Sequence, residues 1–176
     1  MASLIVTNKI ILVGHGPLHY LPFGALFDGQ KTLTDRYAIR LMPSASVLSF
    51  LVSRTIPQAG RVLILGNPKL KDPKYDLAFA QEEALAIGKI HPGSKILLRS
   101  EATASALIAN ARQYRLLHLA AHGVFNPDQP LASALLLAPD QSHSGLLTAS
   151  DLYTLSLDTD LVTLSACETA LGKVST

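Results

Sequence analysis

The chain reads LLHLAAHG at residues 116–123 and LVTLSACET at residues 161–169. Both stretches begin as short apolar runs, which are typical of the buried strands of a parallel α/β sheet. His122 follows the first run, and Cys167, the only cysteine of the chain, follows the second. Parallel sheets carry their chemistry at the carboxyl ends of their strands. We therefore expect an imidazole and a thiol at the same edge of one sheet.

A histidine beside a cysteine is the minimum apparatus of a cysteine nucleophile, because the imidazole takes the thiol proton and leaves a reactive thiolate. A lone cysteine is more often a small buried hydrophobic residue, so Cys167 by itself leaves burial and catalysis both open. Its small neighbours Ser165 and Ala166 leave room for the thiol to reach a cleft. A helix that began after Cys167 would also favour the thiolate through its dipole.

The other histidines fit structural roles better. His118 lies inside the apolar run, and we expect a packed, hydrogen-bonded core residue there. His122 precedes Gly123, where the backbone can turn and let the ring face a cleft. His118 and His122 would not share a helical face in a strand-to-loop run, and the single cysteine cannot build a zinc cage. The sequence therefore predicts no metal site and no cofactor.

Strands and helices alternate along most of the chain. Strand-like apolar runs occur at Ile10–Val13, Ala38–Leu41, Val62–Leu65, Lys95–Leu98, Leu116–Ala120, Leu135–Leu137 and Leu161–Leu164. We expect helices capped by Ser44 and Asp76, one from about Thr103 to Gln113, and a short one from Thr148 to Leu155. This order predicts βαβ units and a parallel sheet. The stretch up to about Met42 is rich in turns and is expected to form a hairpin-like cover.

Composition narrows the class of protein. Apolar residues make up 48% of the 176 residues and charged residues 16%, which indicates a globular domain. The net charge of +2 and the scattered Lys and Arg residues argue against a nucleic-acid partner. No apolar stretch reaches the length of a membrane span, so we expect no membrane partner and a cytoplasmic location.

Taken together, four ordered blocks of the sequence resemble the CHAT-domain family of caspase-like, separase-like cysteine peptidases. The blocks are GPLHYLPFGAL at residues 16–26, PSAS at residues 43–46, LHLAAHG at residues 117–123 and LVTLSACET at residues 161–169. The stretch GLLTASDL at residues 145–152 also fits that family. The resemblance covers nearly the whole chain.

The resemblance implies a fold, a reaction and a site. The fold would be α/β, a caspase-like three-layer α/β/α sandwich with a mostly parallel sheet. Residues 1–176 would be one partial CHAT domain, with residues 1–43 as a family-specific segment and residues 60–176 as the core. Cys167 would be the nucleophile and His122 the base of a cysteine endopeptidase. The backbone N–H groups of Gly123 and Cys167 would hold the oxyanion, and the substrate would be a protein or peptide.

Two departures from the family pattern affect these expectations. His15 stands where the family often has an acidic residue, which concerns a surface turn. The chain also stops at Thr176, shortly after Cys167, whereas the family continues with further strands and helices. We therefore expect the C-terminal part to be missing and the fragment to be inactive or dependent on complementation. A partner that supplies the missing part, or self-association, would cover the open edge of the sheet.

Two other functions fit the sequence less well. The CHAT-like fold can serve as a non-catalytic interaction or scaffold module in which the His–Cys pair is unproductive. A nucleotide- or phosphate-binding α/β module suits the sheet, but the chain lacks the glycine-rich loop and lysine of a phosphate site. Asp151 and Asp160 are available acids, and we expect helix-face and strand-start roles for them rather than a place in a specificity pocket.

Overall fold

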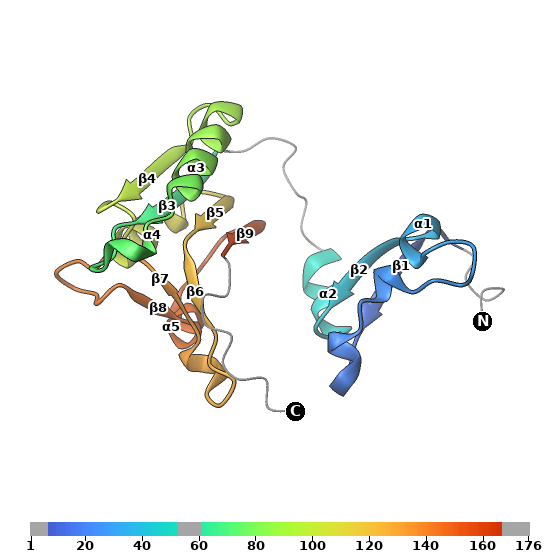
Figure 1. The fold of residues 1–176 in the computed structure, drawn as a ribbon. Helices are drawn as coiled ribbons and strands as arrows, with labels where there is room; N and C mark the ends of the chain where they lie inside the picture. Colours follow the sequence, from blue (N-terminus) through green and yellow to red (C-terminus); the bar gives the residue numbers. More distant parts are fainter. Residues whose placement is uncertain (1–6, 53–60, 167–176) are drawn as a thin grey trace. The chain divides into compact units, whose positions relative to one another are not determined.

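The computed structural model describes residues 7–52 and 61–166 (Figure 1). The chain divides into two compact units, Met1–Thr55 and Ile56–Thr176. Among the described residues, no helix is both long enough and apolar enough to cross a membrane.

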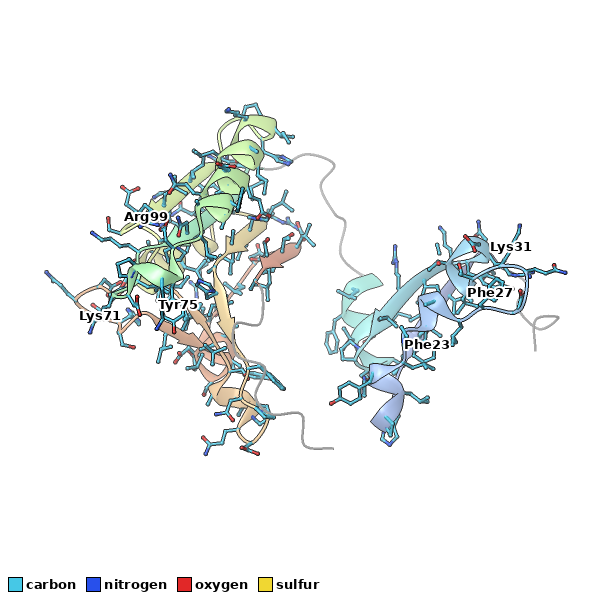
Figure 2. All side chains as sticks on the ribbon, in the orientation of Figure 1. Phe23, Phe27, Lys31, Lys71, Tyr75 and Arg99 are labelled. Carbon is cyan, nitrogen blue, oxygen red and sulfur yellow. The ribbon has the colours of Figure 1, made fainter. Side chains whose placement is uncertain are left out.

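The first unit is built on two parallel strands, β1 (Lys9–Val13) and β2 (Ala38–Met42), with Ile10 opposite Ile39. The connection between them contains two 3₁₀ turns and the short helix α1 (Leu33–Arg36), and α2 (Ser46–Val52) follows β2. The expectation of a hairpin-like cover is therefore wrong. A hairpin requires antiparallel strands, whereas this long connection returns the chain to the starting end of β1. Figure 2 labels Phe23, Phe27 and Lys31 on this connection.

The second unit contains a four-stranded sheet in which all strands run parallel. Its members are β3 (Val62–Pro68), β4 (Lys95–Arg99), β5 (Leu116–Ala120) and β9 (Leu161–Ser165), in the order β4-β3-β5-β9. The four apolar runs expected to form the core sheet all do so. The predicted α/β class with a mostly parallel sheet is confirmed.

The central strand β3 explains why both faces of this sheet are covered. Successive side chains of a strand point to opposite faces, and every residue of β3 is buried. Val62 and Ile64 pack with Ala84 of α3 (Ala78–Ile90) in one hydrophobic cluster. Leu63 and Leu65 belong to another cluster, which includes residues of α4 (Ala104–Ala111). The unit therefore has helices on two faces of one sheet, as a three-layer sandwich requires.

Helix α3 lies very close to β3, and glycine makes this approach possible. A Cβ atom built on Gly66 would lie 2.5 Å from the Cβ of Ala84, which is closer than two non-bonded carbon atoms can approach. A side chain at this position would push α3 away from the sheet.

A second, smaller sheet follows β5. Strands β6 (His122–Val124), β7 (Ala134–Leu136) and β8 (Leu146–Thr148) pair antiparallel in that order. Helix α5 (Ala149–Thr154) begins directly after β8, and Thr148 and Asp151 form a capping box at its start. Asp151 therefore has the helix role expected for it.

The start of α3 differs from the prediction that Asp76 caps it. The residue before the helix is Leu77, which makes no side-chain cap. Asp76 instead forms an ion pair with Arg99, and it accepts a hydrogen bond from Asn67. Asn67 in turn accepts a hydrogen bond from the Leu77 N–H, at 2.8 Å. A cation from another strand thus competes for the carboxylate, and Asn67 takes over part of the capping.

Candidate functional site

His122 is the first residue of β6 and is 7% exposed. The sequence predicts this residue in a turn after the strand, facing a cleft. Instead, it pairs with Leu136 of β7, and its neighbour Gly123 pairs with Leu135. Because it pairs with β7, His122 belongs to a strand of the smaller, antiparallel sheet instead of a turn. The backbone does break between β5 and β6, at Ala121.

A backbone carbonyl orients the His122 ring. The Nε2 atom lies 3.0 Å from the carbonyl oxygen of Tyr75, and the Tyr75 ring meets the imidazole edge-on with 5.5 Å between the ring centroids. A carbonyl oxygen can only accept a hydrogen bond, so Nε2 must carry the proton and donate it. In the neutral ring, Nδ1 is then the basic nitrogen.

Sequence reasoning missed the contribution of Tyr75. The residue ends a 3₁₀ turn, Pro73–Tyr75, which lies between β3 and α3 and is capped by the Asp72 side chain. The group that contacts Nε2 belongs to the main chain, so no residue type signals it. The available signal was the Asp-Pro pair at Asp72 and Pro73, which is typical of such a turn.

Cys167 lies outside the described residues, but its predecessor does not. Ala120 of β5 is in register with Ser165 of β9, so both strands end at the same level. A Cβ built on Gly123 would lie 3.7 Å from the Cβ of Ala166, an ordinary van der Waals contact. The residue after the histidine and the residue before the cysteine are therefore neighbours in space.

A cavity of about 280 Å³ adjoins these two residues. Its lining includes Gly123 and Ala166 together with apolar side chains from β6, β7, β8, α5 and β9, among them Val124, Leu135, Leu152 and Leu164. A group held here would lie beside the chain segment that leads to Cys167.

His118 is buried, as expected, and is 6% exposed. Its Nε2 atom lies 3.1 Å from Oε1 of Glu83 on α3, although the approach does not meet hydrogen-bond geometry. At Nε2, a close contact with a carboxylate therefore stands in place of a hydrogen bond. The other oxygen of Glu83 accepts a hydrogen bond from the Ser165 hydroxyl, at 2.9 Å. One side chain of α3 thus contacts both β5 and β9.

The beginning of β9 is also fixed to β5. Arg115, directly before β5, donates two hydrogen bonds of 2.5 Å to the Asp160 carboxylate, and the Asp160 N–H donates to the Arg115 carbonyl. Asp160 is therefore a strand-start residue, as expected. Within residues 7–52 and 61–166, no three His, Cys, Asp or Glu side chains are grouped so as to hold a metal ion.

A parallel sheet with helices on two faces has the α/β architecture of the caspase-like proteins. The family model of the CHAT domain matches residues 3–176, and the chain belongs to the CHAT-domain family. That family is related to the caspase-like proteases. No curated protein matches the chain.

We predict that neutral His122 carries its proton on Nε2, because the Tyr75 carbonyl accepts from that atom. ¹⁵N-detected NMR of labelled protein, recorded with the ring in its neutral form, reports which nitrogen carries the proton. The signals are assigned by their loss in His122→Gln. A proton on Nδ1 would contradict the arrangement.

We predict that Glu83→Ala lowers the free energy of unfolding by about 1–2 kcal/mol, because it removes a charged hydrogen-bond acceptor and leaves His118 without its partner. Glu82→Ala is the matched control, since Glu82 is the exposed neighbour on the same helix. Urea unfolding followed by circular dichroism measures both changes. Equal effects of the two substitutions would show that the contacts of Glu83 contribute nothing.

Proposed function

We propose that this chain carries the catalytic pair of a cysteine endopeptidase, with Cys167 as nucleophile and His122 as base. The observation that carries the proposal is the closeness of Gly123 and Ala166, the residues next to the two catalytic candidates. Membership of the CHAT-domain family supports it. The hydrogen bond from His122 to the Tyr75 carbonyl supports it further, because it holds the ring in one orientation and tautomer.

In the proposed reaction, Nδ1 of His122 takes the proton of the Cys167 thiol, and the thiolate attacks the carbonyl carbon of the scissile peptide bond. The backbone N–H groups of Gly123 and Cys167 stabilise the negative oxygen of the tetrahedral intermediate. The protonated His122 then gives its proton to the leaving amine as the C–N bond breaks. A water molecule hydrolyses the thioester in the same manner, which releases the acid product and restores the thiol.

The proposal predicts an activated thiol. Cys167 should react with iodoacetamide at pH 7 about tenfold faster than glutathione, because a paired thiol has a larger thiolate fraction than a free one. His122→Ala should remove most of this advantage. The measurement is the second-order rate of alkylation, followed by mass spectrometry.

His91→Ala is the control for that experiment, because His91 lies in the same unit, after the last turn of α3 and before the start of β4. Cys167→Ala should be inert to the reagent and should abolish any peptide cleavage while the circular dichroism spectrum is kept. Slow alkylation that does not respond to His122→Ala would favour the non-catalytic scaffold. Peptide cleavage by Cys167→Ala would exclude Cys167 from the mechanism.

We also propose that β9 pairs with a further strand, from a second copy of the chain or from a partner polypeptide. In the part of the chain that the structure describes, β9 has one hydrogen-bonded neighbour, β5. Its side chains are unusually exposed for a strand of a parallel sheet: Leu161 is 55% and Leu164 is 57% exposed. Such an edge with apolar side chains favours strand addition.

This second proposal predicts concentration-dependent association. Sedimentation velocity should show dimers or larger species, and the double substitution Leu161→Lys with Val162→Lys should shift the protein towards monomer, because charged side chains block edge pairing. The matched control is Phe79→Lys with Ile90→Lys, which adds the same charge at exposed positions of α3. A monomer at all concentrations in the unsubstituted protein would contradict self-association.

A further inference from the structure

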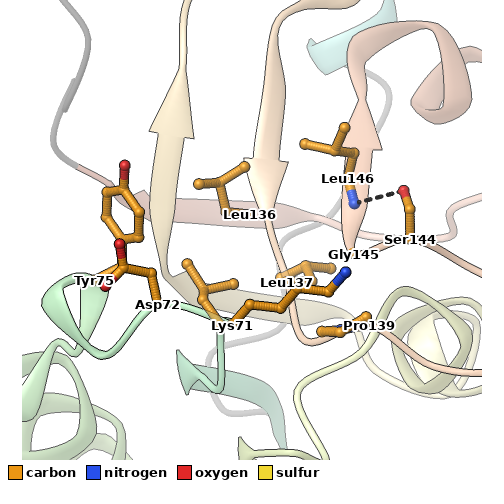
Figure 3. Close-up of a pocket in the computed structure, with 10 residues that line it drawn as sticks. Lys71, Asp72, Tyr75, Leu136, Leu137, Pro139, Ser144, Gly145 and Leu146 are labelled. Carbon is orange, nitrogen blue, oxygen red and sulfur yellow. Dashed lines mark hydrogen bonds between the residues drawn. The ribbon is translucent and has the colours of Figure 1, made fainter.

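A second cavity is lined by Tyr75, the residue whose carbonyl and ring contact His122. Its volume is about 290 Å³. Tyr75 forms part of the wall, and so does Leu136, which is opposite His122 in the β6–β7 pair. The remaining lining residues come from the segment after β3 and from the turn between β7 and β8: Leu70, Lys71, Asp72, Leu137, Pro139, Ser144, Gly145 and Leu146 (Figure 3).

The walls of this cavity suit an apolar side chain. Leucines at positions 70, 136, 137 and 146, together with Pro139, supply most of the surface. The volume is at the lower end of the range for ligand pockets, which fits one or two amino-acid side chains better than a larger molecule. The space is preformed, because the Leu137 N–H donates to the Gly145 carbonyl at 2.7 Å and ties the two ends of the turn together.

The charges around the cavity leave a lysine without a counter-ion. Asp72 forms an ion pair with Lys74 at 2.8 Å, and hydrogen bonds from Lys74 hold the pKa of Asp72 below its ordinary value. Asp76 is paired with Arg99. Lys71 has neither a hydrogen bond nor an ion pair with any residue in 7–52 or 61–166. Figure 3 shows its side chain extended among the lining residues.

We propose that this cavity is a substrate subsite for an apolar residue followed by an acidic one, with the substrate carboxylate paired to Lys71. The inference rests on the proposed peptidase function, which supplies the reason for a peptide to lie beside His122. An apolar wall and an unpaired cation at one pocket select an apolar side chain with a neighbouring negative charge. Lys71 would then be a specificity-determining residue that takes no part in the chemistry.

The test uses peptides that alkylate Cys167. Each probe is an N-chloroacetyl peptide amide ending in Leu-Glu, Leu-Gln or Leu-Lys, with no, one or two glycines before the leucine. The Cys167 thiolate displaces chloride and forms a thioether, so the rate of labelling reports how well the peptide is held. We expect the Leu-Glu probe of one length to react roughly two- to fivefold faster than its Leu-Lys counterpart, the size typical of an exposed ion pair.

Lys71→Glu should reverse this preference, whereas Lys89→Glu, in the last turn of α3, should leave it unchanged. A fourth probe, which ends in Ala-Glu and lacks the apolar side chain, should react more slowly than Leu-Glu. Leu146→Trp, which fills the cavity from β8, should remove this difference. Iodoacetamide is run in parallel, because this small neutral reagent reads the His–Cys pair and not the subsite.

The outcomes separate the two proposals. Slow iodoacetamide labelling that is insensitive to His122→Ala means that the peptidase function fails, and the subsite fails with it. Fast iodoacetamide labelling with equal rates for the Glu and Lys probes at every length overturns the subsite alone. A charge preference that survives Lys71→Glu also overturns it.

Discussion

The parallel pairing of β5 with β9 is the constraint on which the rest of the second unit depends. It sets Ala120 level with Ser165, and so brings the segments after the two strands to the same edge of the sheet. The pairing is held at both ends. The Arg115–Asp160 pair fixes the beginning, and the carboxylate of Glu83 contacts His118 and Ser165 from α3. A slip of one residue would break these contacts and turn each β9 side chain to the opposite face.

Much of this arrangement was predictable from the sequence, because local signals agreed with the tertiary structure. The bounds of β5 are those of the apolar run Leu116–Ala120, and Thr103 and Thr148 cap the helices that follow them. The prediction failed where a distant residue competed with a local signal. Asp76 pairs with Arg99 instead of capping α3. The parallel pairing of β1 and β2 was not predicted, because nothing local in the turns between them signals the direction of the strands. The roles of Glu83 and Tyr75 were not predicted for a related reason. Glu83 contacts residues of strands that lie far along the chain, and Tyr75 contacts His122 through its main-chain carbonyl.

The two cavities lined by neighbours of His122, Gly123 in one and Tyr75 and Leu136 in the other, differ in chemistry although both are mainly apolar. The one that adjoins Gly123 and Ala166 is an open depression lined by residues of strands and of α5, and its lining residues carry no charge. The other is lined by Lys71 and Asp72 of the segment after β3, and Asp72 is neutralised by its ion pair with Lys74. A peptide that passes both cavities would therefore meet a neutral surface at one and the unpaired cation of Lys71 at the other. Selectivity in this molecule would arise from charge on a loop, while the sheet supplies the fixed geometry.

The Tyr75 carbonyl has an evolutionary consequence. Because every amino acid carries the same main-chain oxygen, point substitutions at position 75 can alter the ring that packs on the imidazole without removing the acceptor of its hydrogen bond. An insertion or deletion between Asn67 and Leu77 would displace that oxygen. Selection on the histidine's orientation would therefore act on the length of this loop more strongly than on its composition. The loop can drift in sequence, and with it the side chains that face a substrate, while its backbone path stays constant.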